Sequence, residues 1–226
     1  MMQQQLGWYF PDGETHLPEW MARVGQTRDG LLQYQFAKYT AALKFVRPAR
    51  RVAIDVGAHI GQWSRNMAAD FDVVHAFEPV PDYAACWQAN VGQMPNALLH
   101  PVALGAQTDI VCLKCGTHGS HGDTFVAPKA DAALVAFDVS MRPLDSFDLA
   151  NVDFVKIDCE GYELFVLQGG EKTIRQNRPC IIVEQKPGKA QTYGLGETDA
   201  VSLLKSWGAK VRKVLSGDYI LSWDAA

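Results

Sequence analysis

Short apolar runs alternate with amphipathic stretches from residue 51 onward. The apolar runs have the length and character of buried strands and lie at residues 52–57, 73–79, 97–105, 152–161 and 180–186. Helical spacing of apolar residues between the runs predicts helices at residues 61–69, 81–90, 162–168, 171–177 and 198–207. Because such strands alternate with helices, the pattern predicts an α/β fold with a mostly parallel sheet covered by helices on both faces.

The N-terminal 50 residues do not follow this alternation. Residues 1–30 show no clear period and contain several Gly and Pro residues, so we expect loops with short helices there. Apolar positions at helical spacing then predict a helix over 31–46. We therefore expect residues 1–50 to form an aromatic, partly helical extension that could act as a lid on a main domain over 51–226.

Two further stretches interrupt the pattern within the main domain. Residues 108–140 contain two candidate strands, 108–115 and 133–139, which predict an insertion. Residues 210–223 predict an antiparallel hairpin that turns at Ser216, Gly217 and Asp218.

Charge and cysteine content limit the choice of partners and location. The chain has 226 residues, with 21 Lys plus Arg against 25 Asp plus Glu, a net charge of −4. This balance argues against a general nucleic-acid-binding protein, which needs a basic surface. No apolar run reaches about 18 residues, so we expect no membrane span. Five sparse cysteines are typical of reduced thiols, and we expect a cytoplasmic protein.

Acidic residues follow four of the apolar runs. Asp55, Glu78, Asp158 and Glu184 each lie at the end of a predicted strand. In a parallel sheet with helices on both faces, the ligand crevice lies outside the carboxyl ends of the strands. Four carboxylates would then gather at one edge, although each could instead cap the helix or turn that follows it.

The first strand leads into a glycine-rich turn, Asp55-Val-Gly57-Ala-His59-Ile-Gly61. Glu78 follows 23 residues after Asp55, at the position where an acid commonly binds ribose hydroxyls. A dinucleotide fingerprint requires glycine where this chain has His59, and Asp55 would repel phosphates. S-adenosylmethionine fits better because it combines an adenosine with cationic sulfonium and ammonium groups and has no phosphate.

Methyl transfer to an alkyl hydroxyl benefits from a general base. The candidates with the strongest claim are Asp158, Glu160 and Glu184. If the strand continues to residue 160, Asp158 and Glu160 share a face and raise one another's pKa. The same three carboxylates could alternatively bind Mg²⁺ or Mn²⁺, or Glu160 could cap the helix that starts at residue 162. His118, His121 and Lys156 are further candidates for the base. Lys156 shares a face with Asp158 and is more simply expected to form an ion pair or to extend along the sheet toward solvent.

Five segments resemble the FkbM-type methyltransferases in order and spacing. They are VAIDVGAHIGQWS (52–64), VHAFEP (74–79), LDSF (144–147), DFVKIDCEGYELFVLQG (153–169) and RPCIIVE (178–184). The resemblance implies a Rossmann-like class I methyltransferase fold, with a mostly parallel seven-stranded sheet and a C-terminal antiparallel hairpin. It also implies S-adenosylmethionine as methyl donor and, usually, O-methylation of a hydroxyl on a sugar, glycan or small natural product.

The resemblance also implies which residues bind the cofactor. Those expected around its methionine part are Asp55, Gly57, Ala58, His59 and Gly61. Glu78, with Pro79, would bind the ribose, and Ala103 and Leu104 at the end of the third strand would lie against the adenine. Asp158 would face the methyl group and the acceptor.

The acceptor side is less constrained by the sequence. His118, Ser120 and His121 are expected in an active-site loop that contacts the acceptor. Tyr34 and Gln35 could reach the cofactor. Alternatives to a small-molecule or glycan methyltransferase are a methyltransferase for nucleic acid or nucleotides and a non-catalytic adenosine-binding domain. An NAD-dependent oxidoreductase is disfavoured by His59.

Overall fold

The computed structural model describes residues 1–115, 124–126 and 136–224. Its centre is a seven-stranded sheet with strand order β14-β15-β13-β12-β5-β6-β7. Five strands run parallel: β5 (Val52–Val56), β6 (Val73–Phe77), β7 (Ala97–His100), β12 (Val152–Ile157) and β13 (Cys180–Glu184). The antiparallel hairpin of β14 (Lys210–Leu215) and β15 (Asp218–Ser222) completes one edge. The predicted α/β fold and terminal hairpin are confirmed.

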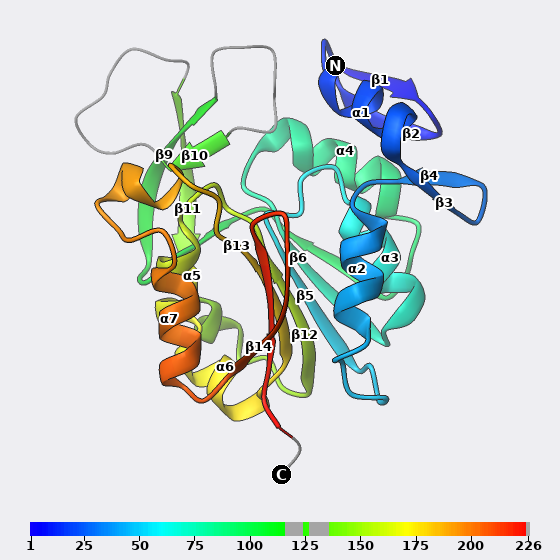
Figure 1. Cartoon of the computed structure of the whole chain (residues 1–226). Helices are drawn as coiled ribbons and strands as arrows, with labels where there is room; N and C mark the ends of the chain where they lie inside the picture. Colours follow the sequence, from blue (N-terminus) through cyan, green and yellow to red (C-terminus); the bar gives the residue numbers. More distant parts are fainter. Residues whose placement is uncertain (116–123, 127–135, 225–226) are drawn as a thin grey trace.

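Helices cover both faces of this sheet (Figure 1). One face packs on α5 (Glu163–Gly169), α6 (Glu171–Asn177) and α7 (Asp199–Ser206), and the other on α2 (Phe36–Leu43), α3 (Gln62–Asp70) and α4 (Pro81–Val91). Successive residues of β5 alternate between the faces: Ile54 packs with the first group of helices and Ala53 with α2 and α3. The strand sequences are continuously apolar because both faces are buried.

A second, four-stranded sheet has the order β10-β9-β11-β8. It comprises β8 (Ala103–Leu104), β9 (Asp109–Cys115), β10 (Thr124–Val126) and β11 (Ala136–Arg142). The single strand predicted over 97–105 is wrong, because β7 ends before Pro101 and β8 joins the second sheet. Proline has no N–H to donate to a strand partner. Ala103 and Leu104 therefore do not end the third strand of the main sheet.

Short elements connect these layers. The 3-10 helix η1 (Leu144–Phe147) follows β11, and η2 (Ala190–Tyr193) precedes α7. Among the described residues, no helix combines the length and apolar character needed to cross a bilayer.

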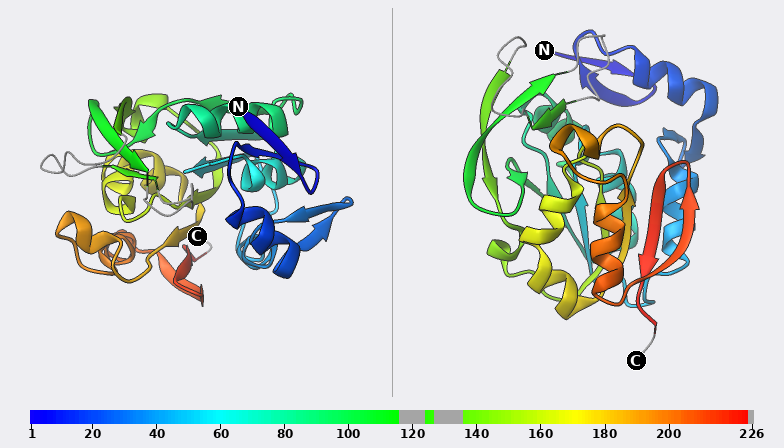
Figure 2. Two further views of the ribbon diagram at one scale, coloured as in Figure 1. Left: turned by 90° about the horizontal axis from the view of Figure 1, so that it is seen from above. Right: turned by 60° about the vertical axis from the view of Figure 1, so that its left-hand side comes forward.

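The N-terminal segment, residues 1–35, forms two small hairpins and one helix rather than loops with short helices. They are β1 (Met2–Gln5) with β2 (Trp8–Pro11), α1 (His16–Val24), and β3 (Gln26–Arg28) with β4 (Leu31–Gln33). The helix predicted over 31–46 covers only α2, because Gln35 adopts a left-handed conformation with φ of 53° and separates it from β4. Figure 2 shows this segment and the second sheet above the same end of the main sheet.

Candidate active site

A cavity of about 450 Å³ lies at the carboxyl ends of β5, β6, β12 and β13. The N-terminal segment supplies one wall and the second sheet supplies another. Its volume is in the range of small-molecule and cofactor sites. The cavity therefore lies where a sheet of this topology places its ligand.

The glycine-rich turn after β5 forms the floor of the cavity. Gly57 has a φ of 72°, and a Cβ atom there would lie 2.0 Å from the Asp158 carbonyl oxygen. His59 also adopts a left-handed conformation, with φ of 51°, although it carries a side chain. Its backbone N–H donates to Glu78 Oε2 at 2.7 Å. The turn is thus fixed against the end of β6.

Glu78 is 4% exposed and is held by backbone groups on both sides. Its Oε2 accepts the His59 N–H, and its Oε1 accepts the Val80 N–H at 2.9 Å. Burial raises the pKa of Glu78 to about 7, against the opposite effect of these N–H groups. Each carboxylate oxygen can accept two hydrogen bonds, so both can also accept from ligand hydroxyls.

Asp55 lies behind the cavity wall rather than on it. The side chain is fully buried, with Oδ2 accepting from Ser64 Oγ at 2.7 Å and Oδ1 lying 3.3 Å from Lys156 Nζ. The ion pair expected for Lys156 is therefore present. Among the cofactor residues expected from the sequence, those that line the cavity are Gly57, Ala58, His59, Glu78, Pro79, Ala103, Leu104 and Asp158. Asp55 and Gly61, which were also expected to bind the cofactor, do not line the cavity.

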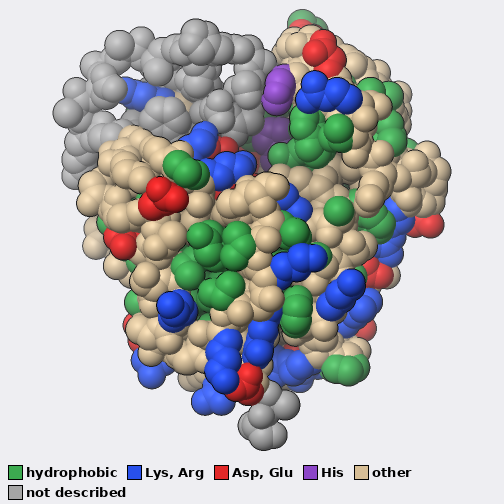
Figure 3. Space-filling view, in the orientation of Figure 1, with side chains coloured by type: hydrophobic (Ala, Val, Ile, Leu, Met, Phe, Trp, Pro, Cys, Tyr) green, Lys and Arg blue, Asp and Glu red, His purple; other side chains and the backbone are tan. Residues whose placement is uncertain are grey.

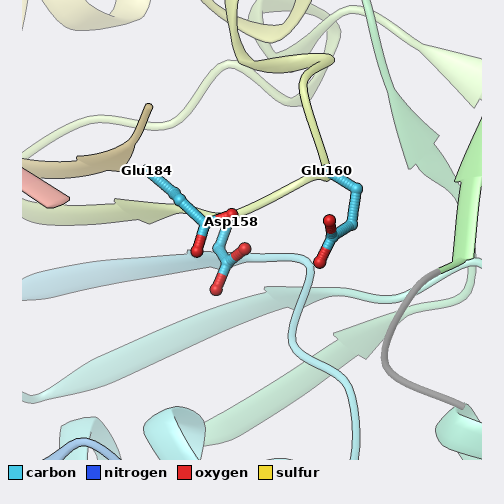
Figure 4. Close-up of side chains that lie close together, drawn as sticks. All are labelled: Asp158, Glu160 and Glu184. Carbon is cyan, nitrogen blue, oxygen red and sulfur yellow. The ribbon is translucent and has the colours of Figure 1, made fainter. Parts of the chain in front are cut away.

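Asp158, Glu160 and Glu184 line the cavity and lie close together (Figure 4). One oxygen of each lies within 4.8 Å of the others. The condition under which Asp158 and Glu160 would share a strand face is not met. The strand β12 ends at Ile157, and Glu160 has a left-handed φ of 54°. The three acids therefore converge through a turn rather than along one strand.

Lysines compensate part of this negative charge. Lys186 Nζ pairs with Glu184 Oε1, and Lys189 Nζ pairs with Glu160 Oε2. Glu184 is 3% exposed, and its Oε2 has no hydrogen-bond partner among the described residues. Burial, followed by the charge of Asp158, raises the pKa of Glu184 to about 8.

Glu163, rather than Glu160, caps the turn after β12. Its Oε1 accepts the N–H groups of Cys159 and Gly161, each at 3.0 Å. Glu163 is 1% exposed, and burial raises its pKa to about 7. The Cys-Glu-Gly-Tyr-Glu spacing was a usable signal, because a glutamate in the first turn of a helix can reach back to preceding N–H groups.

The N-terminal segment contributes several side chains to the cavity, among them Tyr34 and Gln35, which the sequence placed within reach of the cofactor. Trp20 and Tyr34 pack edge to face with ring centroids 5.0 Å apart, and both line the cavity. Burial and nearby Asp158 raise the pKa of Tyr34 to about 12. Other lining residues missed by the sequence analysis are Glu14, His16, Leu17, Lys38, Tyr162 and Lys186. The acceptor residues expected at His118, Ser120 and His121 lie outside the described residues.

Two solved structures with a similar fold are named as methyltransferases. The chain matches methyltransferase FkbM from Methylobacillus flagellatus KT with a TM-score of 0.50 and 17% identity, covering 90% of this chain and 49% of that one. It matches precorrin-6y C5,15-methyltransferase from Geobacter metallireducens GS-15 with a TM-score of 0.50 and 15% identity, covering 88% and 95%. This chain thus spans about half the length of the first protein. The fold is that of the Rossmann-like methyltransferases.

Sequence comparison identifies the family within this class. The model of the methyltransferase FkbM domain matches residues 55–210, more than half of the chain. The protein therefore belongs to the FkbM methyltransferase family. No curated protein matches it significantly.

Proposed function

We propose that this protein transfers the methyl group of S-adenosylmethionine to a hydroxyl group of a sugar, glycan or small natural product. The observation that carries the proposal is the link between the glycine-rich turn and Glu78 at the ends of β5 and β6. It combines a close backbone turn with a buried carboxylate that can bind hydroxyls, which suits an adenosine-containing ligand.

The cofactor-binding residues follow from this arrangement. Glu78 would accept hydrogen bonds from the ribose, and the backbone from Gly57 to His59 would lie against the methionine part. Ala103 and Leu104, together with the ring of Tyr83, offer an apolar surface for the adenine. When bound, the cofactor supplies a methyl group already activated by a sulfonium charge, so these residues need only bind and orient it.

The acceptor would bind between the carboxylate cluster and the N-terminal segment. Trp20 and Tyr34 provide aromatic surface, while Asp158 and Glu184 provide hydrogen-bond acceptors. Aromatic faces together with carboxylates can bind the apolar and hydroxyl-bearing sides of a sugar ring. We assign acceptor recognition to this part of the cavity and orientation of the hydroxyl to Asp158.

Glu184 is the proposed general base. Glu184 lines the cavity, and its buried Oε2 has no hydrogen-bond partner among the described residues, so we assign to it the proton of an acceptor hydroxyl. Burial and Asp158 make it more basic than an ordinary carboxylate. Lys186 holds the other oxygen and fixes the carboxylate in place.

We propose that the lysines, rather than a divalent ion, balance the carboxylate cluster. Lys186 and Lys189 already pair with Glu184 and Glu160, so they supply positive charge that a metal ion would otherwise supply. A magnesium-dependent mechanism is the alternative, since three carboxylates within reach of one another can bind such an ion. We expect incubation with EDTA to leave the methyl-transfer rate unchanged, and a loss restored by Mg²⁺ would support the alternative.

A nucleic-acid acceptor receives less support from the surface charge. Figure 3 shows Lys and Arg side chains scattered over one face and most numerous toward its lower end. That end is opposite the carboxyl ends of the strands, where the cavity lies (Figure 1). A nucleic-acid enzyme would place basic residues around the site to bind phosphates.

The test is a methyl-transfer assay with labelled S-adenosylmethionine and panels of sugar, lipid, nucleoside and RNA acceptors. We expect label in hydroxyl-bearing sugars or small natural products. Transfer restricted to RNA or nucleosides would contradict the proposed acceptor class. Failure of the protein to bind S-adenosylhomocysteine by calorimetry would contradict the assigned cofactor site.

A further inference from the structure

A buried lysine lies directly beneath the glycine-rich turn. The parallel register of β12 and β5 pairs Lys156 with Asp55. Both side chains point toward α3, because residues two positions earlier, Phe154 and Ala53, pack with α2 and α3. Asp55 is fully buried and Lys156 is 5% exposed. The strand register therefore places two opposite charges side by side inside the protein.

The ammonium group of Lys156 contacts the turn itself. Its Nζ donates to the carbonyl oxygens of Val56 at 3.1 Å and Gly57 at 2.6 Å, and lies 3.3 Å from Asp55 Oδ1. Two of the three N–H donors of the ammonium group thus bind carbonyls of the turn, and Asp55 Oδ1 lies at ion-pair distance. Lys156 also lines the cavity, whereas Asp55 does not.

A chain of hydrogen bonds holds Asp55 from the other side. Trp87 Nε1 of α4 donates to Ser64 Oγ at 2.8 Å, and Ser64 donates to Asp55 Oδ2 at 2.7 Å. Asp55 in turn raises the pKa of Lys156, so that the lysine keeps its charge despite burial. Two helices thus fix the position of the ammonium group under the turn.

We propose that Lys156 is a positioning residue for S-adenosylmethionine: held by Asp55, its ammonium group fixes the carbonyls of Val56 and Gly57 and so sets the conformation of the cofactor-binding turn. Asp55 then acts through Lys156, without touching the cofactor. A buried ion pair is weak evidence for stability, since apolar residues of similar volume often stabilise a fold as well. Its contacts with the turn give this pair a role in binding. The inference rests on the proposed cofactor site.

The test uses the double variant Asp55→Asn/Lys156→Met, which removes both charges together. Because no unpaired charge stays buried, we expect it to fold, with a thermal midpoint within a few degrees of the wild type. Without an ammonium group the carbonyls lose their donor, and we expect the Kd for S-adenosylhomocysteine, by calorimetry, to rise roughly tenfold or more. A folded double variant that binds within twofold of the wild type would overturn the proposal.

A second measurement uses the single variant Asp55→Asn, which keeps the lysine. S-adenosylmethionine carries a sulfonium charge that S-adenosylhomocysteine lacks. An ammonium group no longer balanced by Asp55 should weaken binding of the charged ligand relative to the neutral-sulfur ligand by roughly threefold or more. An unchanged ratio would show that the pair lies too far from the cofactor to position it, and this result decides the question if the double variant does not fold.

Two controls separate this inference from the proposed function. If the wild-type protein binds neither ligand, the cofactor site itself is wrong. If the wild type binds both ligands and the two variants bind them equally well, only the role of Lys156 is wrong. The variant Lys172→Met, which removes an exposed lysine paired with Asp148, should leave both affinities unchanged.

Discussion

The β6 side and the β13 side of the cavity each hold a buried glutamate, but the two are held differently. Both oxygens of Glu78 accept backbone N–H groups, from His59 and Val80. Glu184 has Lys186 on one oxygen, while its other oxygen has no hydrogen-bond partner among the described residues. Burial raises the pKa of both side chains. The same residue type therefore occurs once with both oxygens bound by backbone N–H groups and once with an oxygen that has no hydrogen-bond partner among the described residues.

This difference indicates separate roles for the two glutamates, one in ligand binding and one in proton transfer. A carboxylate fixed by two backbone donors keeps its position and suits the recognition of a ligand. A carboxylate that lies near the charge of Asp158 and has an oxygen without a hydrogen-bond partner suits proton transfer. Glu184 should therefore affect turnover, whereas Glu78 should affect cofactor affinity.

The largest expected effect is that of Glu184→Gln. Removal of a general base should lower kcat roughly 10²-fold or more with the best acceptor of the panel. The Kd for S-adenosylhomocysteine should stay within twofold, because Glu184 lies on the acceptor side. Steady-state kinetics and calorimetry on the same preparation measure both quantities. A larger change in Kd than in kcat would assign Glu184 to cofactor binding.

The pH profile of the wild type provides the matching control. Glu184 must lose its proton before it can act as base, and its pKa is raised to about 8. The rate should therefore rise from pH 6 to pH 8 and level off above the pKa of Glu184. In Glu184→Gln the rise should disappear from the residual activity. A profile that is flat over this range in the wild type would argue against Glu184 as the base.

An intermediate effect is expected for Glu78→Gln. The amide N–H₂ would face one of the two backbone N–H groups, so the turn at His59 should shift and the ribose should lose an acceptor. We expect the Kd for S-adenosylhomocysteine to rise about tenfold, since a hydrogen bond to a charged group contributes about 1.5–3 kcal/mol. Calorimetry measures this directly.

Glu163→Gln is the matched control. Glu163 is also buried, accepts two backbone N–H groups, and has a pKa raised to about 7, but it does not line the cavity. The control should leave cofactor affinity within twofold. Equal weakening by both variants would mean that Glu78 acts only on the fold.

The sequence identified the parts of the site that depend on strands and local turns. Glu78, Asp158 and Glu184 all reach the cavity, because continuous apolar runs locate the strand ends to within a residue or two. That precision is too low to predict whether the side chain of Asp55 faces the cavity. Asp55 is the fourth residue of β5, and strand alternation directs its side chain under the turn instead of into the cavity. The sequence pattern alone does not fix the end of the strand to one residue, and an error of one residue changes the face on which the side chain lies.

Contacts between distant segments could not be predicted from the sequence, for a different reason. Trp8, Phe10 and Met21 pack against Ile60 and Cys86, which fixes the N-terminal segment against the turn and α4. The segment has no hydrophobic period because its short hairpins bury isolated aromatic residues rather than a continuous face. Its aromatic content was visible in the sequence, but its position beside the carboxylate cluster was not.

The smallest expected effect tests whether this segment shapes the acceptor site. Trp20→Ala removes one ring of the pair that faces the cavity, and we expect the KM for the acceptor to rise about threefold to tenfold, as for the loss of an aromatic contact. Trp20→Phe should retain most of the affinity. Trp207→Ala is the matched control, because Trp207 is also half-buried but lies at the end of α7, outside the lining residues. If Trp20→Ala instead weakens S-adenosylhomocysteine and leaves the acceptor KM unchanged, the N-terminal segment belongs to the cofactor side of the cavity.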